Sequence, residues 1–135
     1  MSIADEQFIS FTTYRRSGEP VSTPTWVVPV SDGRVGFWTA MGTGKTQRLA
    51  HTPRVLVQPS DRRGRVRDDT APLEGTAEMV RSGVLFDEVR GRVRAKYGFM
   101  TKLTGLLARL GPQGRQGLTY ADTVVLVRLA EDPRA

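Results

Sequence analysis

The order of the secondary-structure signals before residue 44 most constrains the fold of this chain. Segments typical of β-strands occupy residues 8–14, 20–30 and 34–39, and only short turns separate them. Three strands joined in this way predict an antiparallel meander. A doubly wound α/β fold needs a regular alternation of strands and helices, so this order excludes that fold.

The rest of the chain adds further strands and two helical insertions. We expect a helix at about 44–51, strands at 54–59 and 72–81, a helix at 82–97, a second apolar helical stripe from Met100 to Leu110, a loop at 111–117 and a final strand at 119–129. Because Pro24 and Pro29 cannot donate to a β-ladder, the segment 20–30 must lie at a sheet edge or carry bulges. Six strands with two helical insertions predict a mainly β fold, a small antiparallel barrel that forms a single domain over residues 1–135.

The composition predicts a soluble protein that attracts polyanions. The chain has 20 Lys and Arg against 14 Asp and Glu, for a net charge of +6, which would attract nucleic acid, an acidic membrane or a multiply charged cofactor. With no cysteine and one histidine, we expect no disulfide and no metal site. No apolar run is long enough to span a bilayer and the N-terminus does not read as a signal peptide, so we expect a cytoplasmic protein without a membrane partner. Nucleic-acid barrels expose aromatic residues among basic ones, whereas aromatics are only 7% here, so we expect no nucleic acid partner.

A glycine-rich turn in the sequence VGFWTAMGTGKTQRLAH, residues 35–51, predicts an anion site. It joins a strand to the start of a basic helix, where backbone N–H groups and the helix dipole favour a phosphate. Lys45 and Arg48 are three residues apart, so we expect them to share one face of the first helical turn. A P-loop would need glycine six residues before the lysine, and Thr39 stands there, which excludes a P-loop. The residues alone leave open a loop with solvated charges.

Taken in order, several segments resemble the pyridoxamine 5′-phosphate oxidase-like family of flavin- and deazaflavin-dependent oxidoreductases. The likeness covers about residues 6–128 and runs through FISFTTYRRSGEPVSTPTWVV, VGFWTAMGTGKTQRLAHTPRVLVQPSDRRGRV, LEGTAEMV and the KYG at 96–98. Within the family the chain is most similar to the branch that uses coenzyme F-420, an 8-hydroxy-5-deazaflavin. The resemblance implies a split β-barrel of the FMN-binding type and a homodimer with two cofactor sites at the subunit interface.

The resemblance also implies which residues bind the cofactor. Lys45 and Arg48 would hold its phosphate, with Thr39, Thr43 and Gly44 forming the turn. The second strand would lie along the deazaflavin ring and the fourth would approach from the other side. These positions are Ser22, Thr23, Pro24, Thr25, Trp26 and Val27 on the second strand, and Gln58, Pro59 and Ser60 on the fourth. A basic track for the acidic cofactor tail would comprise Arg54, Arg62, Arg63 and Arg65, unless these form a solvated turn paired with Asp61, Asp68 and Asp69.

The implied reaction is hydride transfer from reduced F-420 to a small organic substrate, with conjugated compounds as candidates. The cofactor supplies the chemistry, so we expect no catalytic side chain. Two alternatives remain: an FMN-binding oxidoreductase of the same fold, and a cofactor-binding protein without turnover.

Other residues with functional potential receive structural expectations. We expect a backbone carbonyl to satisfy His51 at the helix end, Trp26 to line the ring pocket, and Trp38 to lie in the core. A substrate wall or lid is expected from Tyr97, Phe99 and Met100. A solvated helix face is expected from Arg90, Arg92, Arg94, Lys96 and Lys102.

Overall fold

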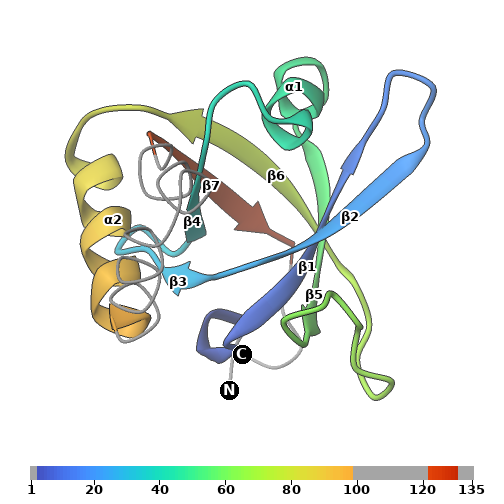
Figure 1. Ribbon diagram of the computed structural model, residues 1–135, viewed down its shortest axis with the longest axis horizontal. Helices are drawn as coiled ribbons and strands as arrows, with labels where there is room; N and C mark the ends of the chain where they lie inside the picture. The colour runs from blue at the N-terminus through green and yellow to red at the C-terminus, as the bar shows by residue number, and fades with distance from the viewer. Residues whose placement is uncertain (1–2, 99–121, 131–135) are drawn as a thin grey trace, which may run out of the picture.

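Seven antiparallel strands form one strongly curled sheet in the computed structural model, which describes residues 3–98 and 122–130 (Figure 1). The strand order is β2-β1-β5-β6-β7-β4-β3. The elements are the 3₁₀ turn η1 (Ile3–Asp5), β1 (Phe8–Tyr14), β2 (Pro20–Thr25), β3 (Val28–Pro29), β4 (Val35–Thr39), α1 (Gly44–His51), β5 (Arg54–Ser60), β6 (Leu73–Val80), α2 (Val84–Lys96) and β7 (Thr123–Leu129). A mainly β, antiparallel barrel with helical insertions is therefore confirmed.

The sheet is rolled because one continuous stretch of chain supplies both of its edges. Strands β2 and β3 are the two edge strands, yet only Trp26 and Val27 separate them in sequence. Three Cα–Cα steps span at most about 11 Å, so the two edges must lie close together. The barrel is thus closed along one line by a crossover, defined here as residues Trp26–Val27, and no β-ladder joins β2 to β3.

The crossover corrects the expectation of a single strand over residues 20–30. That segment divides into β2 and β3, because its two halves pair with different neighbours: β2 with β1, and β3 with β4. The expected edge position is confirmed for both halves. Prolines are tolerated there because each edge strand has a side without a ladder partner.

The sheet has an apolar core on each face. Inside the barrel, Phe11 and Phe37 meet edge to face with ring centroids 4.8 Å apart. On the outer face, α2 covers β3, β4 and β7 (Figure 1). Strand β7 serves both cores, because Val125 packs inside while Val124 packs outside, and this explains its unbroken apolar sequence.

Helix α2 lies close to the sheet because β4 contains a glycine. A Cβ placed on Gly36 would lie 3.0 Å from Cγ2 of Val89, so a larger residue would push the helix outward. Residues Phe86, Val89 and Val93 are buried at helical spacing, as the sequence predicts for this segment.

The structure contains the other expected elements: the helix at 44–51 and the strands near 54–59, 72–81 and 119–129. The last of these strands begins at Thr123 among the described residues. The apolar stripe from Met100 to Leu110, the loop at 111–117 and the residues Phe99, Met100 and Lys102 lie outside the described residues. Within residues 3–98 and 122–130, no helix has the length and apolar character needed to cross a bilayer.

Candidate cofactor site

A pocket of about 260 Å³ lies at the end of β2, beside the start of α1. Five separate parts of the chain meet there: the start of β1, the end of β2 with the crossover, β4, α1, and the loop after β5. The lining residues are Phe8, Pro24, Thr25, Trp26, Trp38, Lys45 and Arg62. Three aromatic side chains and two cations, with no carboxylate in the lining, give a pocket suited to a planar anionic ligand.

The tryptophans form adjoining parts of this pocket. Trp26 and Trp38 have ring centroids 6.0 Å apart with planes inclined at 40°. Trp26 lines the pocket as expected. Trp38 packs against the outer core as expected, and it lines the pocket as well. Strand β3 pairs only with Val35 and Gly36, so the end of β4 that carries Trp38 extends beyond it.

Tyr97 is not a wall or lid of the pocket, which corrects another expectation. Its side chain is 2% exposed, and its ring stacks on Trp26 with centroids 4.4 Å apart and planes within 5°. The tyrosine therefore lies behind the tryptophan that lines the pocket. It supports that wall without forming its surface.

Two hydroxyl groups on β2 are buried without a hydrogen-bond partner in the described part of the chain. They are Oγ1 of Thr23 and Oγ1 of Thr25. The two residues are separated by one position, so they point to the same face of the strand, and Thr25 lines the pocket. A buried polar group without a partner costs about 1–3 kcal/mol, so a polar ligand edge that bonds to Thr25 would recover free energy. These residues therefore fit the polar edge of a flavin-type ring.

Lys45 is a cation without a carboxylate partner among the described residues. Its Nζ lies 5.4 Å from the centroid of the Phe37 ring. Burial, and to a lesser extent the nearby charge of Arg48, lowers the pKa of Lys45 to about 8. A bound anion would compensate this charge, so the electrostatics of the pocket favour an anionic ligand.

The turn before α1 is braced by side chains. Oγ1 of Thr43 accepts a hydrogen bond from the N–H of Thr46 at 3.3 Å, which makes Thr43 the N-cap. The carboxylate of Asp122 accepts from the N–H of Met41 at 2.9 Å and so ties the turn to the start of β7. Thr39 ends β4 just before this turn, where it pairs with Thr123.

A second hollow, of about 570 Å³, lies against a different face of α1. Its lining residues are Arg15, Arg16, Gly44, Gln47, Arg48, Ala50 and His51, so it contains three arginines and no carboxylate. Nε of Arg48 donates to Oγ1 of Thr13 at 2.5 Å, and a Cβ on Gly44 would lie 2.7 Å from Nη1 of Arg48. Glycine thus leaves room for this guanidinium. Burial and the charge of Arg15 lower the pKa of Arg48.

Lys45 and Arg48 line two different hollows, so the expectation that together they hold one phosphate stays a prediction. They still interact, because the Arg48 charge contributes to the lowered pKa of Lys45. His51, at the end of α1, lies with Nδ1 2.8 Å from Oγ1 of Thr52. The expectation of a backbone carbonyl partner for His51 is therefore wrong.

The residues expected from the fourth predicted strand do not line this pocket. They are Gln58, Pro59 and Ser60, and they lie on β5. Nε2 of Gln58 donates to the carbonyl oxygen of Thr70 at 3.0 Å, and Oγ of Ser60 donates to that of Asp61 at 3.0 Å. Both side chains brace the loop after β5. This loop supplies Arg62 to the pocket. It also lies against β2, since a Cβ built on Gly64 would be only 3.3 Å from Cδ of Pro24.

The other residues of the expected site are dispersed. Oγ of Ser22 lies 2.7 Å from Oγ1 of Thr12, Val27 is buried, and Pro59 pairs with Ile9. The guanidinium of Arg54 lies 4.8 Å from the Tyr14 ring. In the loop, the carboxylate of Asp61 accepts from the backbone N–H groups of Arg63 and Arg65, while both arginines remain exposed.

Sequence reasoning missed Phe8 as a lining residue. Its only signal was an aromatic residue at the start of a strand, which does not distinguish a pocket from a core. The position becomes meaningful once the crossover is known to bring Trp26 beside the start of β1.

The chain belongs to the pyridoxamine 5′-phosphate oxidase family, whose sequence profile matches residues 2–127. No curated protein matches the sequence. The solved structures that share the fold include the following three. A conserved hypothetical protein of Mycobacterium tuberculosis has a TM-score of 0.63 and 21% identity, over 96% of this chain and 76% of that one.

The other two are an F-420 reductase and a FAD-binding protein of Mesorhizobium loti. The F-420 reductase has a TM-score of 0.55 and 16% identity, over 98% of this chain and 94% of that one. The FAD-binding protein has a TM-score of 0.56 and 15% identity, over 96% and 83%. At these identities the likeness establishes the fold alone.

Proposed function

We propose that the protein binds the deazaflavin coenzyme F-420 and uses it to reduce a small organic substrate. The observation that carries this proposal is the Lys45 ammonium, which has no carboxylate partner among the described residues and lies beside an aromatic pocket. The pocket walls suit a planar ring, and the cation suits the phosphate attached to it. The family supports a redox cofactor over other planar anions.

Each part of the site has a role in this proposal. Trp26 and Trp38 flank the ring, and Oγ1 of Thr25 bonds to its polar edge. Lys45 and the N-terminal turn of α1 hold the phosphate, because a helix start leaves N–H groups without intrahelical acceptors. When bound, the cofactor supplies hydride transfer. The protein orients the ring against the substrate and excludes water, and no side chain is assigned as a catalytic acid.

The acidic tail of the cofactor would extend over the basic surface on either side of Lys45. Arg62 lies on one side, and the hollow that holds Arg15, Arg16 and Arg48 lies on the other. In both linings cations face solvent without a lining carboxylate, so a polyanion would meet favourable charge in either direction. The affinity should therefore fall as salt increases.

The proposal includes a homodimer with a cofactor site at each end of the subunit interface. Two large apolar side chains, Met41 and Val66, are each 44% exposed, on the turn before α1 and on the loop that carries Arg62. Both segments border the pocket, so a second subunit that covered them would also cover the cofactor. Light scattering after size-exclusion chromatography tests this: a monomer at working concentration rejects the interface site.

The cofactor is tested by titrating the protein with F-420, FMN and FAD while following fluorescence. We expect F-420 to bind most tightly and Lys45→Met to weaken binding by about 1.5–3 kcal/mol, the worth of a hydrogen bond to a charged group. Arg94→Met, at an exposed position of α2, is the matched control and should bind as the wild type does. Binding of FMN alone would replace F-420 in the proposal, and binding of none of the three would reject it. Oxidation of reduced F-420 by a panel of conjugated compounds then separates an enzyme from a protein that only binds the cofactor.

A further inference from the structure

The C-terminal end of α2 contains a lysine that is exposed, as expected for a solvated helix face, yet whose ammonium group is fully engaged. Nζ of Lys96 donates to the carbonyl oxygens of Ala4, Glu6 and Val27 at 2.9, 2.6 and 2.7 Å. An ammonium group has three N–H donors, so all of them are satisfied. Lys96 therefore ties the N-terminal segment to the crossover.

The next residue, Tyr97, joins the same two segments. Its hydroxyl accepts a hydrogen bond from the N–H of Val27 at 3.0 Å and donates to the carbonyl oxygen of Gln7 at 2.7 Å. Burial raises the pKa of Tyr97, so the hydroxyl keeps the proton that it donates. Its ring meanwhile stacks on Trp26.

The residues held in this way are the immediate neighbours of two pocket walls. Gln7 precedes Phe8, and Val27 follows Trp26, and both Phe8 and Trp26 line the pocket. The crossover belongs to no β-strand, so no ladder fixes its position relative to the sheet. Besides the burial of Val27 in the barrel core, its position depends on Lys96 and Tyr97 at the C-terminal end of α2.

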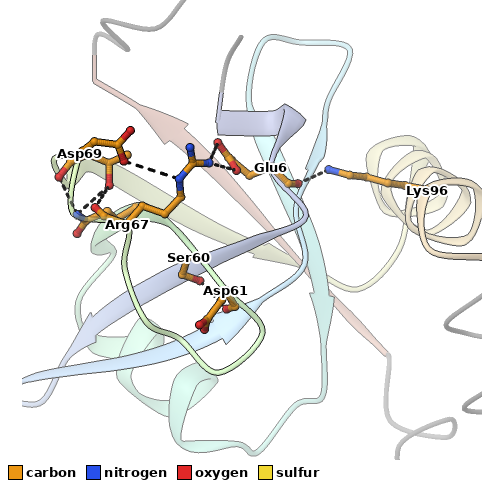
Figure 2. Close-up of polar contacts among 8 residues, drawn as sticks. Glu6, Ser60, Asp61, Arg67, Asp69 and Lys96 are labelled. Atoms are coloured by element: carbon orange, nitrogen blue, oxygen red, sulfur yellow. Dashed lines mark hydrogen bonds and ion pairs between the residues drawn. The ribbon is translucent and has the colours of Figure 1, made fainter.

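The same N-terminal segment is linked to a third wall. The carboxylate of Glu6 accepts two hydrogen bonds from Nη1 of Arg67, at 3.3 and 3.2 Å. Arg67 belongs to the loop that supplies Arg62 to the pocket. Figure 2 shows the continuous path from Lys96 through Glu6 to Arg67. Arg67 is half exposed, so this outer link is weaker than the contacts of the buried Tyr97.

We propose that Lys96 and Tyr97 are positioning residues that set the distance between the Phe8 and Trp26 walls of the cofactor pocket. The inference rests on the proposed function for the identity of the ligand, while the geometry of the free pocket can be measured without one. If Lys96 and Tyr97 had a purely structural role, replacing them would lower the stability of the protein and leave the shape of the pocket unchanged. A positioning role requires the shape of the pocket to change in a protein that remains folded.

The variants Tyr97→Phe and Lys96→Met separate these roles. Tyr97→Phe keeps the ring that stacks on Trp26 and removes the hydroxyl that holds Gln7 and Val27. Lys96→Met keeps an unbranched side chain and removes the three donors. Arg94→Met, two residues earlier at an exposed position, is the matched control.

The first measurement needs no cofactor. In a Trp38→Phe background Trp26 is the sole tryptophan, and iodide quenching reports its exposure at temperatures well below unfolding. We expect at least a twofold increase in the quenching constant for Tyr97→Phe and for Lys96→Met, and no change for Arg94→Met. Unchanged quenching in both variants would overturn the proposal, whether or not either variant is less stable.

The second measurement uses F-420 with the tryptophan at position 38 restored. We expect each variant to lose about tenfold in affinity while circular dichroism shows a folded protein. Affinity within twofold of the wild type in both variants would also overturn the proposal. If the wild type itself binds none of F-420, FMN and FAD, the proposed function fails, and the quenching result still decides whether Lys96 and Tyr97 position Trp26.

Discussion

Replacing Lys45 with methionine should make the ligand-free protein more stable and the cofactor complex weaker. Lys45 is half-buried, with its ammonium beside the Phe37 ring, has no carboxylate partner in the described part of the chain, and has a pKa of about 8. In the unfolded chain its pKa is about 10.4. Folding thus disfavours its charged form, and a phosphate in the pocket would favour that form again.

The pH dependence follows from this difference with a definite sign. Between pH 8 and about 10.4 the unfolded chain binds more protons at this site than the folded protein, so stability rises with pH across that window. The cost of burying the charge is fully present below pH 8. Lys45→Met removes this cost, so we expect it to raise the melting temperature at pH 7, with the gain disappearing towards pH 10.

Cofactor binding should show the opposite trend. If the bound phosphate returns the pKa of Lys45 to about 10.4, the wild-type affinity falls about tenfold between pH 7 and pH 9, because the free protein loses the proton that the complex needs. Lys45→Met should bind more weakly at pH 7 and remove this part of the dependence.

Fluorescence titration at several pH values, with the same titrations on Arg94→Met, measures the effect. A wild-type affinity that is constant from pH 7 to pH 9, or a Lys45→Met profile that keeps the tenfold fall, would refute the electrostatic role of Lys45. A ligand that ionises in this range would change both profiles equally, so the difference between the two proteins is the decisive quantity.

Four substitutions test other parts of the structure. Arg48→Ala should weaken cofactor binding by about 1.5–3 kcal/mol in the same titration if this guanidinium contacts the phosphate. Gly44→Ala should weaken binding several-fold with little effect on urea unfolding, because its Cβ would displace the guanidinium of Arg48 from a position 2.7 Å away. Gly36→Ala should destabilise the fold by about 1–3 kcal/mol, since its Cβ would lie 3.0 Å from Val89, whereas Gly91→Ala on open helix surface should stabilise it by about 0.5–1 kcal/mol.

Local sequence patterns were sufficient to predict most of the secondary structure. Alternation of apolar residues marked the strands, and the glycine-rich turn marked the start of α1. These signals depend on neighbours within a few residues, where the sequence is directly informative. The division of residues 20–30 into two strands depends on partners that lie elsewhere in the chain, and no local pattern encodes them.

The same distinction explains which side chains were misjudged. Lys96 has a spacing typical of a solvated helix face, yet its acceptors are 69 to 92 positions away in sequence. Tyr97 is next to a predicted helix break, which suggested a lid, but its partners are likewise distant. Conversely, Lys45 was identified from its place in a glycine-rich turn at a helix start, where local sequence is informative. Trp26 was identified through the resemblance to a family, because a tryptophan in isolation does not indicate a pocket.

The location of the pocket follows from how the barrel is closed. Elsewhere in the barrel, neighbouring strands are joined by ladders, and inward-facing side chains are committed to the core. Between β2 and β3 the chain itself crosses the gap, so Trp26 has no ladder partner and the end of β4 extends past its short neighbour. Aromatic side chains can therefore face a ligand at this line without breaking strand pairing. The start of α1 lies beside the same line and adds Lys45, so the irregularity that closes the fold also provides both the walls and the charge of the site.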